Sequence, residues 1–391
     1  MSNQTTKPVQ PLLLTAAYYL SFIVLGLATA AEGPSLPTLA KHTSSPLELI
    51  SLLFVFGALG YLLGSLIGGR AYDRFPGHRI ITFSMLVILT AAAVFPLASR
   101  LWLLLLAALV MGLGKGALDV GCNTLLQWVH GDHVGPYMNG LHFSFGVGSF
   151  LSPILLAQII SATHEIYWVF WTIALLCLPL AVWFWFLPEP PAHLKTGDQE
   201  HSPVPLLPVL LIVLAFVLYV GAEVGFSSWI YTYALTLNLA TTVTAAYLTS
   251  AFWGLFTLGR LLGIWVAGRA SPRTILFTDL AGCLFGLCLI ILGHASAPLL
   301  WVGSSIFGLS MASIFPTILM LAGKRLRVTG TITGWFLVGA GLGGMFLPWL
   351  IGQAFVLIGP SFMMFIIVAD LMLEAMILLF FIYGHRKVAL A

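Results

Sequence analysis

The chain has 391 residues, of which 60% are hydrophobic and only 7% are charged, and its formal net charge is +3 at pH 7. Soluble domains carry about 25% charged residues, so this composition excludes a soluble globular protein and indicates an integral membrane protein. The slight positive charge gives no reason to expect a nucleic-acid partner. The four cysteines lie in apolar stretches without disulfide or metal-ligand spacing and are interpreted as packing residues.

Apolar segments long enough to span a bilayer, for which a helix needs about 20 residues, recur along the whole chain. In chain order they are 12–40, 46–69, 79–98, 101–129, 136–162, 165–187, 205–235, 241–268, 273–293, 297–322, 328–356 and 360–383. The sequence therefore predicts an all-α membrane protein with twelve transmembrane helices, located as a multi-pass protein in the cell membrane, with the lipid bilayer as its surroundings.

Basic residues are distributed unevenly among the connecting loops. If the N-terminus is cytoplasmic, twelve Lys and Arg side chains fall on the inner side and only Lys41 and Arg100 on the outer side. Because cytoplasmic loops carry the excess of Lys and Arg, we expect both termini to be cytoplasmic. Ala28-Thr29-Ala30 could be a signal-peptidase site, but the apolar stretch before it is longer than the usual 7–15 residues or so, and we interpret it as a retained helix.

A segment rich in proline and charge, 188–204, divides the chain into an N-terminal half (1–187) and a C-terminal half (205–391). Several motifs recur in the same order in the two halves at a spacing of about 195 positions, which is typical of parallel six-helix repeats with a substrate site between them. The matched motifs are Gly69-Arg70 with Gly268-Arg269, Gly112-Leu113 with Gly308-Leu309, Gly146-x-Gly148-x4-Pro153 with Gly341-x-Gly343-x4-Pro348, and Glu32 with Glu223.

Within the fourth apolar segment, polar residues recur at every fourth position: Lys115, Asp119, Asn123 and Gln127. Because an α-helix has about 3.6 residues per turn, these side chains lie on one slowly rotating stripe that covers roughly 18 Å of the helix. Charged groups at this depth are costly and usually face a protein interior or a water-filled cavity. The stripe therefore predicts a polar path through the membrane, and a path implies transport.

The loop after the second segment, Gly69-Arg-Ala-Tyr-Asp73-Arg74-Phe-Pro-Gly77-His78-Arg79, resembles the cytoplasmic signature of the major facilitator superfamily, with one residue added between Arg74 and Gly77. Two further segments are similar to the fucose–proton symporter branch and its sodium-dependent glucose transporter-like relatives. The first is the glycine-rich run Gly112-Leu-Gly-Lys-Gly116, which continues to Asp119 and Asn123; that branch usually has Glu in place of Asp119. The second is Asn139-Gly-Leu-His142-Phe-Ser-Phe-Gly146. The resemblance implies two pseudo-symmetric six-helix bundles and a conformational latch formed by Gly69, Asp73, Arg74, Gly77, Arg79 and Arg269.

Three carboxylates are candidates for coupling transport to H⁺ or Na⁺: Asp119 first, then Glu32 and Glu223. Asp119 could hold Na⁺, and no other metal or cofactor is expected. Two alternatives stay open: a static ion pair of Asp119 with Lys115, and a solvated Glu32 near the outer surface. A buried Arg260 has Asp279, Asp73 or the substrate as candidate partners, and the pairing of Asp370 and Glu374 stays open.

The candidate substrate ligands are neutral amides, an imidazole and indole rings, a set that suits the hydroxyl groups and C–H faces of a sugar. They are Asn123, Gln127, Asn139, His142, Trp229, Trp253 and Trp335, although each Trp could equally belong to the interfacial aromatic belt. The sequence thus predicts a monomeric secondary transporter that couples H⁺ or Na⁺ to symport of a monosaccharide or similar small polar solute by alternating access. The alternatives are a proton-coupled efflux antiporter of hydrophobic or cationic compounds and, less favoured, a sensor or a lipid enzyme, for which no nucleophile–base set is recognisable.

Overall fold

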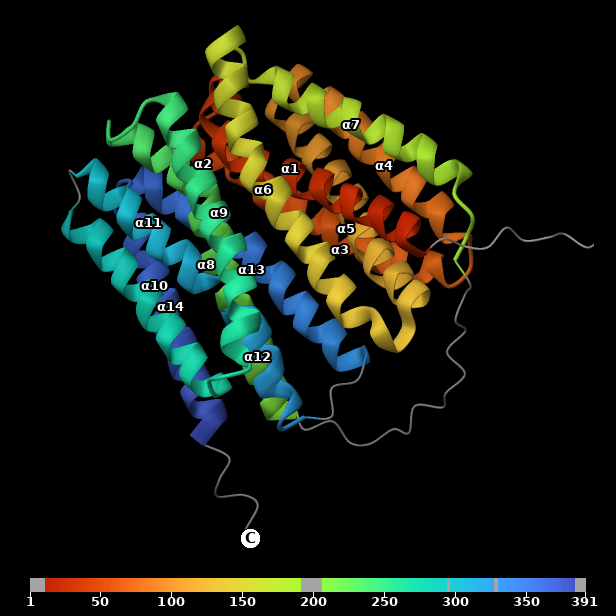
Figure 1. Cartoon of the computed structure of the whole chain (residues 1–391). Helices are drawn as coiled ribbons and strands as arrows, with labels where there is room; N and C mark the ends of the chain where they lie inside the picture. The colour runs from red at the N-terminus through yellow and green to blue at the C-terminus, as the bar shows by residue number, and fades with distance from the viewer. Residues whose placement is uncertain (1–10, 191–205, 294–295, 327–329, 384–391) are drawn as a thin grey trace, which may run out of the picture.

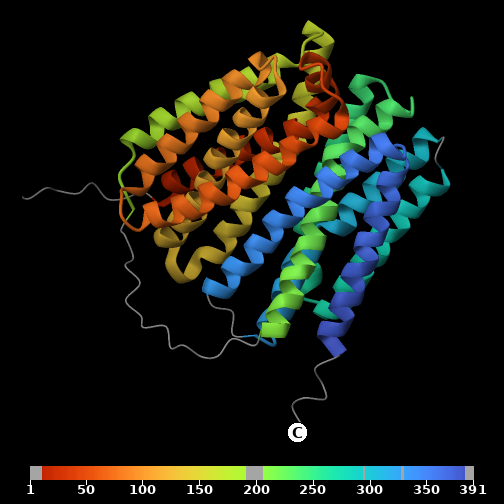
Figure 2. The ribbon, with the colours of Figure 1, turned by 180° about the vertical axis from the view of Figure 1, so that it is seen from behind.

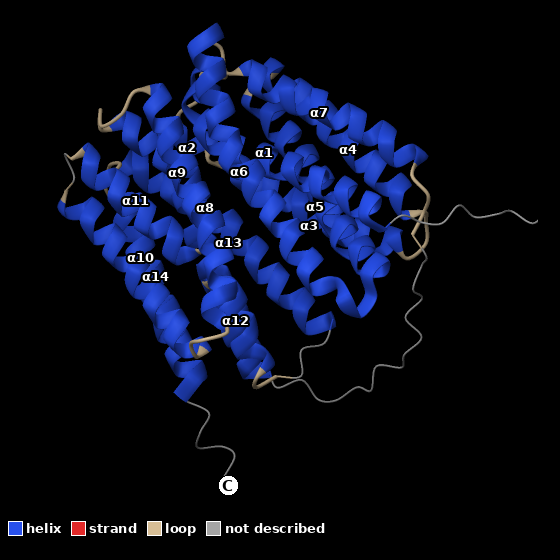
Figure 3. Cartoon of the chain, viewed as in Figure 1, coloured by secondary structure: helices blue, strands red, loops and turns tan. Residues whose placement is uncertain are grey.

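The computed structural model describes residues 11–190, 206–293, 296–326 and 330–383, and within these ranges every regular element is a helix (Figure 3). Twelve helices are long and apolar enough to cross a membrane, which confirms the predicted fold class and helix count. Five of the twelve basic residues used to predict the topology, and nearly all of the predicted linker 188–204, lie outside the described residues; the five are Lys7, Lys195, Arg327, Arg386 and Lys387.

Each predicted segment corresponds to one helix or to a pair of consecutive helices. In chain order these are α1 (Pro11–His42), α2 (Leu47–Ile50), α3 (Leu52–Tyr72), α4 (Gly77–Val94), α5 (Leu101–His130), α6 (Val134–Thr163), α7 (Tyr167–Phe186), α8 (Leu206–Thr236), α9 (Thr242–Ala267), α10 (Pro272–Leu292), α11 (Ala297–Met311), α12 (Ile314–Gly323), α13 (Gly330–Leu357) and α14 (Phe362–Tyr383). A short 3₁₀ turn, Phe95–Leu97, follows α4, and another, Gly131–His133, follows α5.

The predicted span 297–322 is interrupted between α11 and α12, at Ala312 and Ser313. Pro316 lies in the first turn of α12 and has no backbone N–H to donate to the carbonyl of Ala312, so a continuous helix would lose that hydrogen bond. The hydroxyl of Ser313 instead donates to the Asp279 carboxylate on α10 at 2.5 Å. Ser313, at the break between α11 and α12, thus forms a polar contact with α10.

The helices pack as two bundles (Figures 1 and 2). In the first, α5 packs against α3 and α4, α6 against α1, and α7 against α4; in the second, α8 packs against α13 and α14, and α11 against α9 and α10. Four helix pairs of the described residues join the bundles: α6 with α9, α3 with α13, α2 with α13, and α1 with α8. Any site between the bundles must therefore be lined by these helices and their neighbours.

One close helix crossing occurs in both bundles. A Cβ placed on Gly148 of α6 would lie 2.0 Å from the carbonyl oxygen of Ile23 on α1, and a Cβ placed on Gly343 of α13 would lie 2.0 Å from the carbonyl oxygen of Val217 on α8. Only glycine allows backbones to approach this closely. These two glycines are the pair that the repeated Gly-x-Gly-x4-Pro motif aligns, so the repeat marks equivalent crossings.

We expect Gly148→Ala to lower the free energy of unfolding by about 1–3 kcal/mol, because the added methyl group forces α1 and α6 apart. The matched control is Gly135→Ala on the same helix, where no atom lies within 4 Å of the added Cβ. The control should be neutral or stabilising by up to about 1 kcal/mol, because alanine favours helix. Thermal unfolding of both variants in detergent checks this, and equal unfolding temperatures would contradict the close crossing.

Candidate transport site

A buried ion pair connects α5 to α1 in the first bundle. Lys115 Nζ lies 2.5 Å from Glu32 Oε1, and the two side chains are 8% and 16% exposed. It is the one ion pair within 4 Å in the part of the chain that the structure describes. Glu32 is therefore paired within the protein, and Lys115 is paired with Glu32 instead of with Asp119.

Asp119 is held by neutral donors. The hydroxyl of Tyr61 on α3 donates to Asp119 Oδ2, and Asn123 Nδ2 donates to Asp119 Oδ1 at 2.7 Å and to its backbone carbonyl at 2.9 Å. Asn123 and Asp119 are both half-buried. No cation within the described residues forms an ion pair with Asp119, so its carboxylate is not held in a salt bridge.

The second bundle has a different charge arrangement. Glu223 on α8 interacts with Arg260 on α9 and with the hydroxyl of Tyr219. Arg260 also interacts electrostatically with His142 on α6, in the other bundle, and its guanidinium carbon lies 4.6 Å from the centre of the Phe256 ring. The Nε atom of Arg260 is buried without a hydrogen-bond partner among the described residues. Arg260 thus lies where α9 meets α6, between the bundles.

Neither of the two acids expected as partners of Arg260 forms an ion pair with it. Asp279 accepts a hydrogen bond from Ser313, and Asp73 is exposed in the loop between α3 and α4. The acid that interacts electrostatically with Arg260 is Glu223, without forming an ion pair within 4 Å. Asp370 and Glu374 are buried in α14, which packs on α8, α10 and α13 of its own bundle, and so they lie outside the contact between the bundles.

Sequence reasoning missed Tyr61 as the partner of Asp119. The internal repeat carried the signal, because Tyr61 lies nine residues before Arg70 and Arg260 lies nine residues before Arg269, the arginines of the matched Gly-Arg motifs. The same position of the repeat therefore interacts with an acid in each bundle: Tyr61 donates a hydrogen bond to Asp119 in the first, and Arg260 interacts electrostatically with Glu223 in the second. A tyrosine donates to one acid, and an arginine balances the charge of the other.

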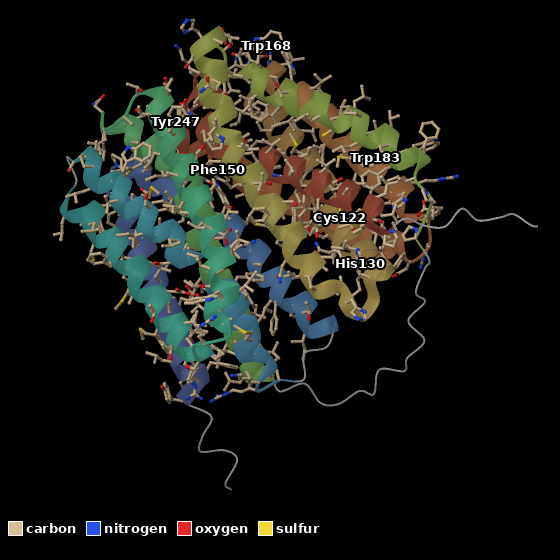
Figure 4. The ribbon with its side chains drawn as sticks, in the orientation of Figure 1. Cys122, His130, Phe150, Trp168, Trp183 and Tyr247 are labelled. Carbon is tan, nitrogen blue, oxygen red and sulfur yellow. The ribbon has the colours of Figure 1, made fainter. Side chains whose placement is uncertain are left out.

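The candidate substrate residues have unequal surroundings. Trp253 on α9 is buried and meets the Phe145 ring of α6 edge-on at 6.3 Å, and His142 on α6 is exposed, 5.9 Å from the Phe22 ring. The α6–α9 contact thus brings His142, Trp253 and Arg260 to the boundary between the bundles. Figure 4 shows Phe150 and Tyr247 on the same two helices.

The other candidates lie elsewhere. Trp229 is fully buried, its indole N–H donates to the Pro348 carbonyl at 2.9 Å, and its ring lies 6.4 Å from Phe54 of the first bundle. In this conformation Trp229 packs between the bundles and has no free donor. Gln127 and Asn139 are exposed, and Trp335 is 56% exposed.

The two bundles are joined near one end of the molecule, the end expected to be extracellular. Gly33 of α1 packs against the backbone of Ser228 on α8, and Gln158 Nε2 donates to the Tyr247 hydroxyl at 2.7 Å. Gln353 Nε2 donates to the Glu48 carbonyl at 2.9 Å. The ribbons diverge toward the opposite end (Figures 1 and 2). The structure therefore has the two bundles joined at this end.

The expected latch residues do not connect the bundles in this conformation. The charged residues of this set are all exposed, namely Asp73, Arg74, Arg79 and Arg269. The guanidinium carbon of Arg79 lies 5.6 Å from the centre of the Trp185 ring, and the guanidinium carbon of Arg269 lies 4.0 Å from the centre of the Trp265 ring. Gly77 packs on Leu125, and a Cβ on Gly69 would meet Val120. Each of these contacts stays within one bundle, as expected when the bundles are apart at this end.

Twelve spanning helices in two bundles, with ionisable side chains where the bundles meet, define a multi-pass membrane transporter. The chain belongs to the Major Facilitator Superfamily, whose family model matches residues 18–348. It is therefore a transporter and not an enzyme, as the sequence motifs indicated.

Similar proteins include two named sodium-dependent glucose transporter 1. The protein from Xenopus laevis is 32% identical over 362 residues, a match that covers 83% of this chain and 72% of that protein. The protein from Danio rerio is 30% identical over 380 residues, a match that covers 87% of this chain and 64% of that protein. The chain thus spans less than two thirds of the Danio rerio protein. The crystal structure of a D-xylose-proton symporter has a TM-score of 0.81 at 14% identity, covering 95% of this chain and 97% of that one, which shows the shared fold.

Proposed function

We propose that the chain is a secondary-active symporter that moves a monosaccharide or similar small polar solute together with H⁺ or Na⁺ by alternating access. One observation carries the proposal: Asp119 lies inside the membrane span between Tyr61 and Asn123, with neutral donors and no ion-pair partner among the described residues. The names of the two glucose-transporter relatives support a sugar as the solute.

Asp119 is the proposed coupling residue. A free carboxylate is costly to enclose between closely packed helices, and that cost falls when a proton or Na⁺ neutralises it. Cation binding at Asp119 would therefore favour the conformations in which the bundles close around it. Glu32 is paired with Lys115, and Glu223 interacts electrostatically with Arg260, so we assign these two acids secondary roles.

The proposed solute site lies at the α6–α9 contact and along the polar stripe of α5. His142, Asn123 and the unpartnered Nε of Arg260 supply donors and acceptors for hydroxyl groups, and Trp253 supplies an aromatic face. Gln127, Asn139 and Trp335 are proposed for the path leading to the site.

Uptake by the purified protein in proteoliposomes tests the proposal. A panel of labelled monosaccharides and polyols is offered with a pH gradient or a Na⁺ gradient imposed separately. We expect one class of solute to be accumulated under one of the two gradients, and to show counterflow without any gradient. Absence of counterflow for every sugar, together with gradient-driven efflux of lipophilic compounds, would contradict the proposal and favour the antiporter.

A further inference from the structure

A cavity lies at the end of the second bundle where α10 begins and where α12 and α14 end, at the bottom of the molecule in Figure 1. Its volume is about 300 Å³. Its lining residues are Ser271, Pro272, Arg273, Leu321, Lys324, Arg325, Phe381 and Ile382. On the charge-derived topology this end meets the cytoplasmic surface of the membrane.

The cavity collects positive charge without a negative partner. Three of its lining side chains are cationic, namely Arg273, Lys324 and Arg325, and none is acidic. No ion pair is formed by any of them with the described residues. Like charges around one cavity repel each other unless an anion is supplied from outside the protein.

The three cations are held differently. Both terminal nitrogens of Arg325 donate to backbone carbonyls at the end of α14, those of Phe381 and Ile382, and so fix the guanidinium at the wall of the cavity. Arg273 lies at the start of α10, with its guanidinium carbon 5.7 Å from the centre of the Tyr383 ring. Lys324 is exposed, and its side chain forms no ion pair with the described residues. Arg273 and Lys324 are therefore free to bind a ligand.

We propose that this basic cavity binds a phosphate-bearing anion, supplied at the membrane surface by the headgroup of an anionic phospholipid. Guanidinium and ammonium groups form charge-assisted hydrogen bonds with phosphate oxygens, and basic pockets between helices at the cytoplasmic surface suit such headgroups. The apolar part of the wall, Leu321, Phe381 and Ile382, is suited to the glycerol and first methylene groups of a lipid. This site is separate from the proposed transport site, and its test does not depend on transport.

The test is photocrosslinking with the full chain in nanodiscs. Phosphatidylglycerol and phosphatidylcholine probes, each with a photoactivatable group near the headgroup, are compared by mass spectrometry of the labelled peptides. We expect phosphatidylglycerol to label the segments around 271–273 and 321–325 and phosphatidylcholine to label them far less. The double variant Arg273→Gln/Lys324→Gln should lose about fivefold in labelling per charge removed.

Two further variants make the result specific. Arg273→Lys/Lys324→Arg keeps both charges and should retain labelling, which separates charge from folding. Arg100→Gln removes an exposed charge expected on the opposite face of the membrane and should change nothing. Added inorganic phosphate identifies the source: if it displaces the lipid probe at low concentration, the phosphate-bearing anion is free phosphate. Equal labelling by both lipids, or undiminished labelling of Arg273→Gln/Lys324→Gln, would overturn the proposal.

Discussion

Replacing Asp119 by Asn should abolish accumulation of the solute against its gradient and leave solute exchange intact. The amide preserves the size of the side chain and can still hydrogen-bond to Tyr61 and Asn123, but it carries no charge to be neutralised. With one cation per solute, a cation gradient of about tenfold supports accumulation of at most about tenfold. We expect that ratio to fall to about one in Asp119→Asn, measured by uptake into proteoliposomes, while counterflow continues.

The matched control is Asp279→Asn. Asp279 is a half-buried acid on α10 that accepts a hydrogen bond from Ser313, away from the helices that join the bundles. The Asp279→Asn variant should accumulate solute to the same extent as the unaltered protein. Normal accumulation by Asp119→Asn would show that coupling takes place elsewhere, and loss of counterflow as well would mean that Asp119 is needed for the movement of the bundles themselves.

The second large effect concerns the stability of the first bundle. Changing Glu32 to Gln leaves the Lys115 ammonium buried without a counter-ion, and the free energy of unfolding should fall by about 3–5 kcal/mol. Lys115→Met should have a similar cost, because it leaves the Glu32 carboxylate unpaired. The double variant removes both charges and should recover most of the loss.

Unfolding of the four proteins in the same detergent gives the coupling energy between the two side chains. Gln127→Ala is a useful control, because it changes an exposed residue of the same helix that lies outside this pair. If the losses of the two single variants simply add in the double variant, the ion pair does not stabilise the bundle.

Hydropathy alone was sufficient to predict the helices. A spanning helix needs a long run of apolar residues whatever its neighbours are, so the signal is local and strong. The break between α11 and α12 was missed because the residues on both sides are apolar, although Pro316 was a local sign of it.

The site could be predicted only in part. The polar stripe of α5 depends on helical periodicity, which sequence carries, and its charged residues do bond to neighbouring helices inside the fold. Their partners could not be predicted in the same way: Glu32 lies 83 positions from Lys115, and Tyr61 lies 58 positions from Asp119. Lys115 had an acid one turn away on its own helix, and only the packing of α1 against α5 shows that it reaches Glu32 instead.

The two glycine crossings have a mechanical consequence. Where Gly148 meets Ile23 and Gly343 meets Val217, backbone touches backbone, so neither helix pair can slide or tilt without a clash. Each bundle is thereby stiff along the helices that face its partner. In the proposed mechanism, cation binding would therefore move one bundle as a body against the other instead of deforming either of them.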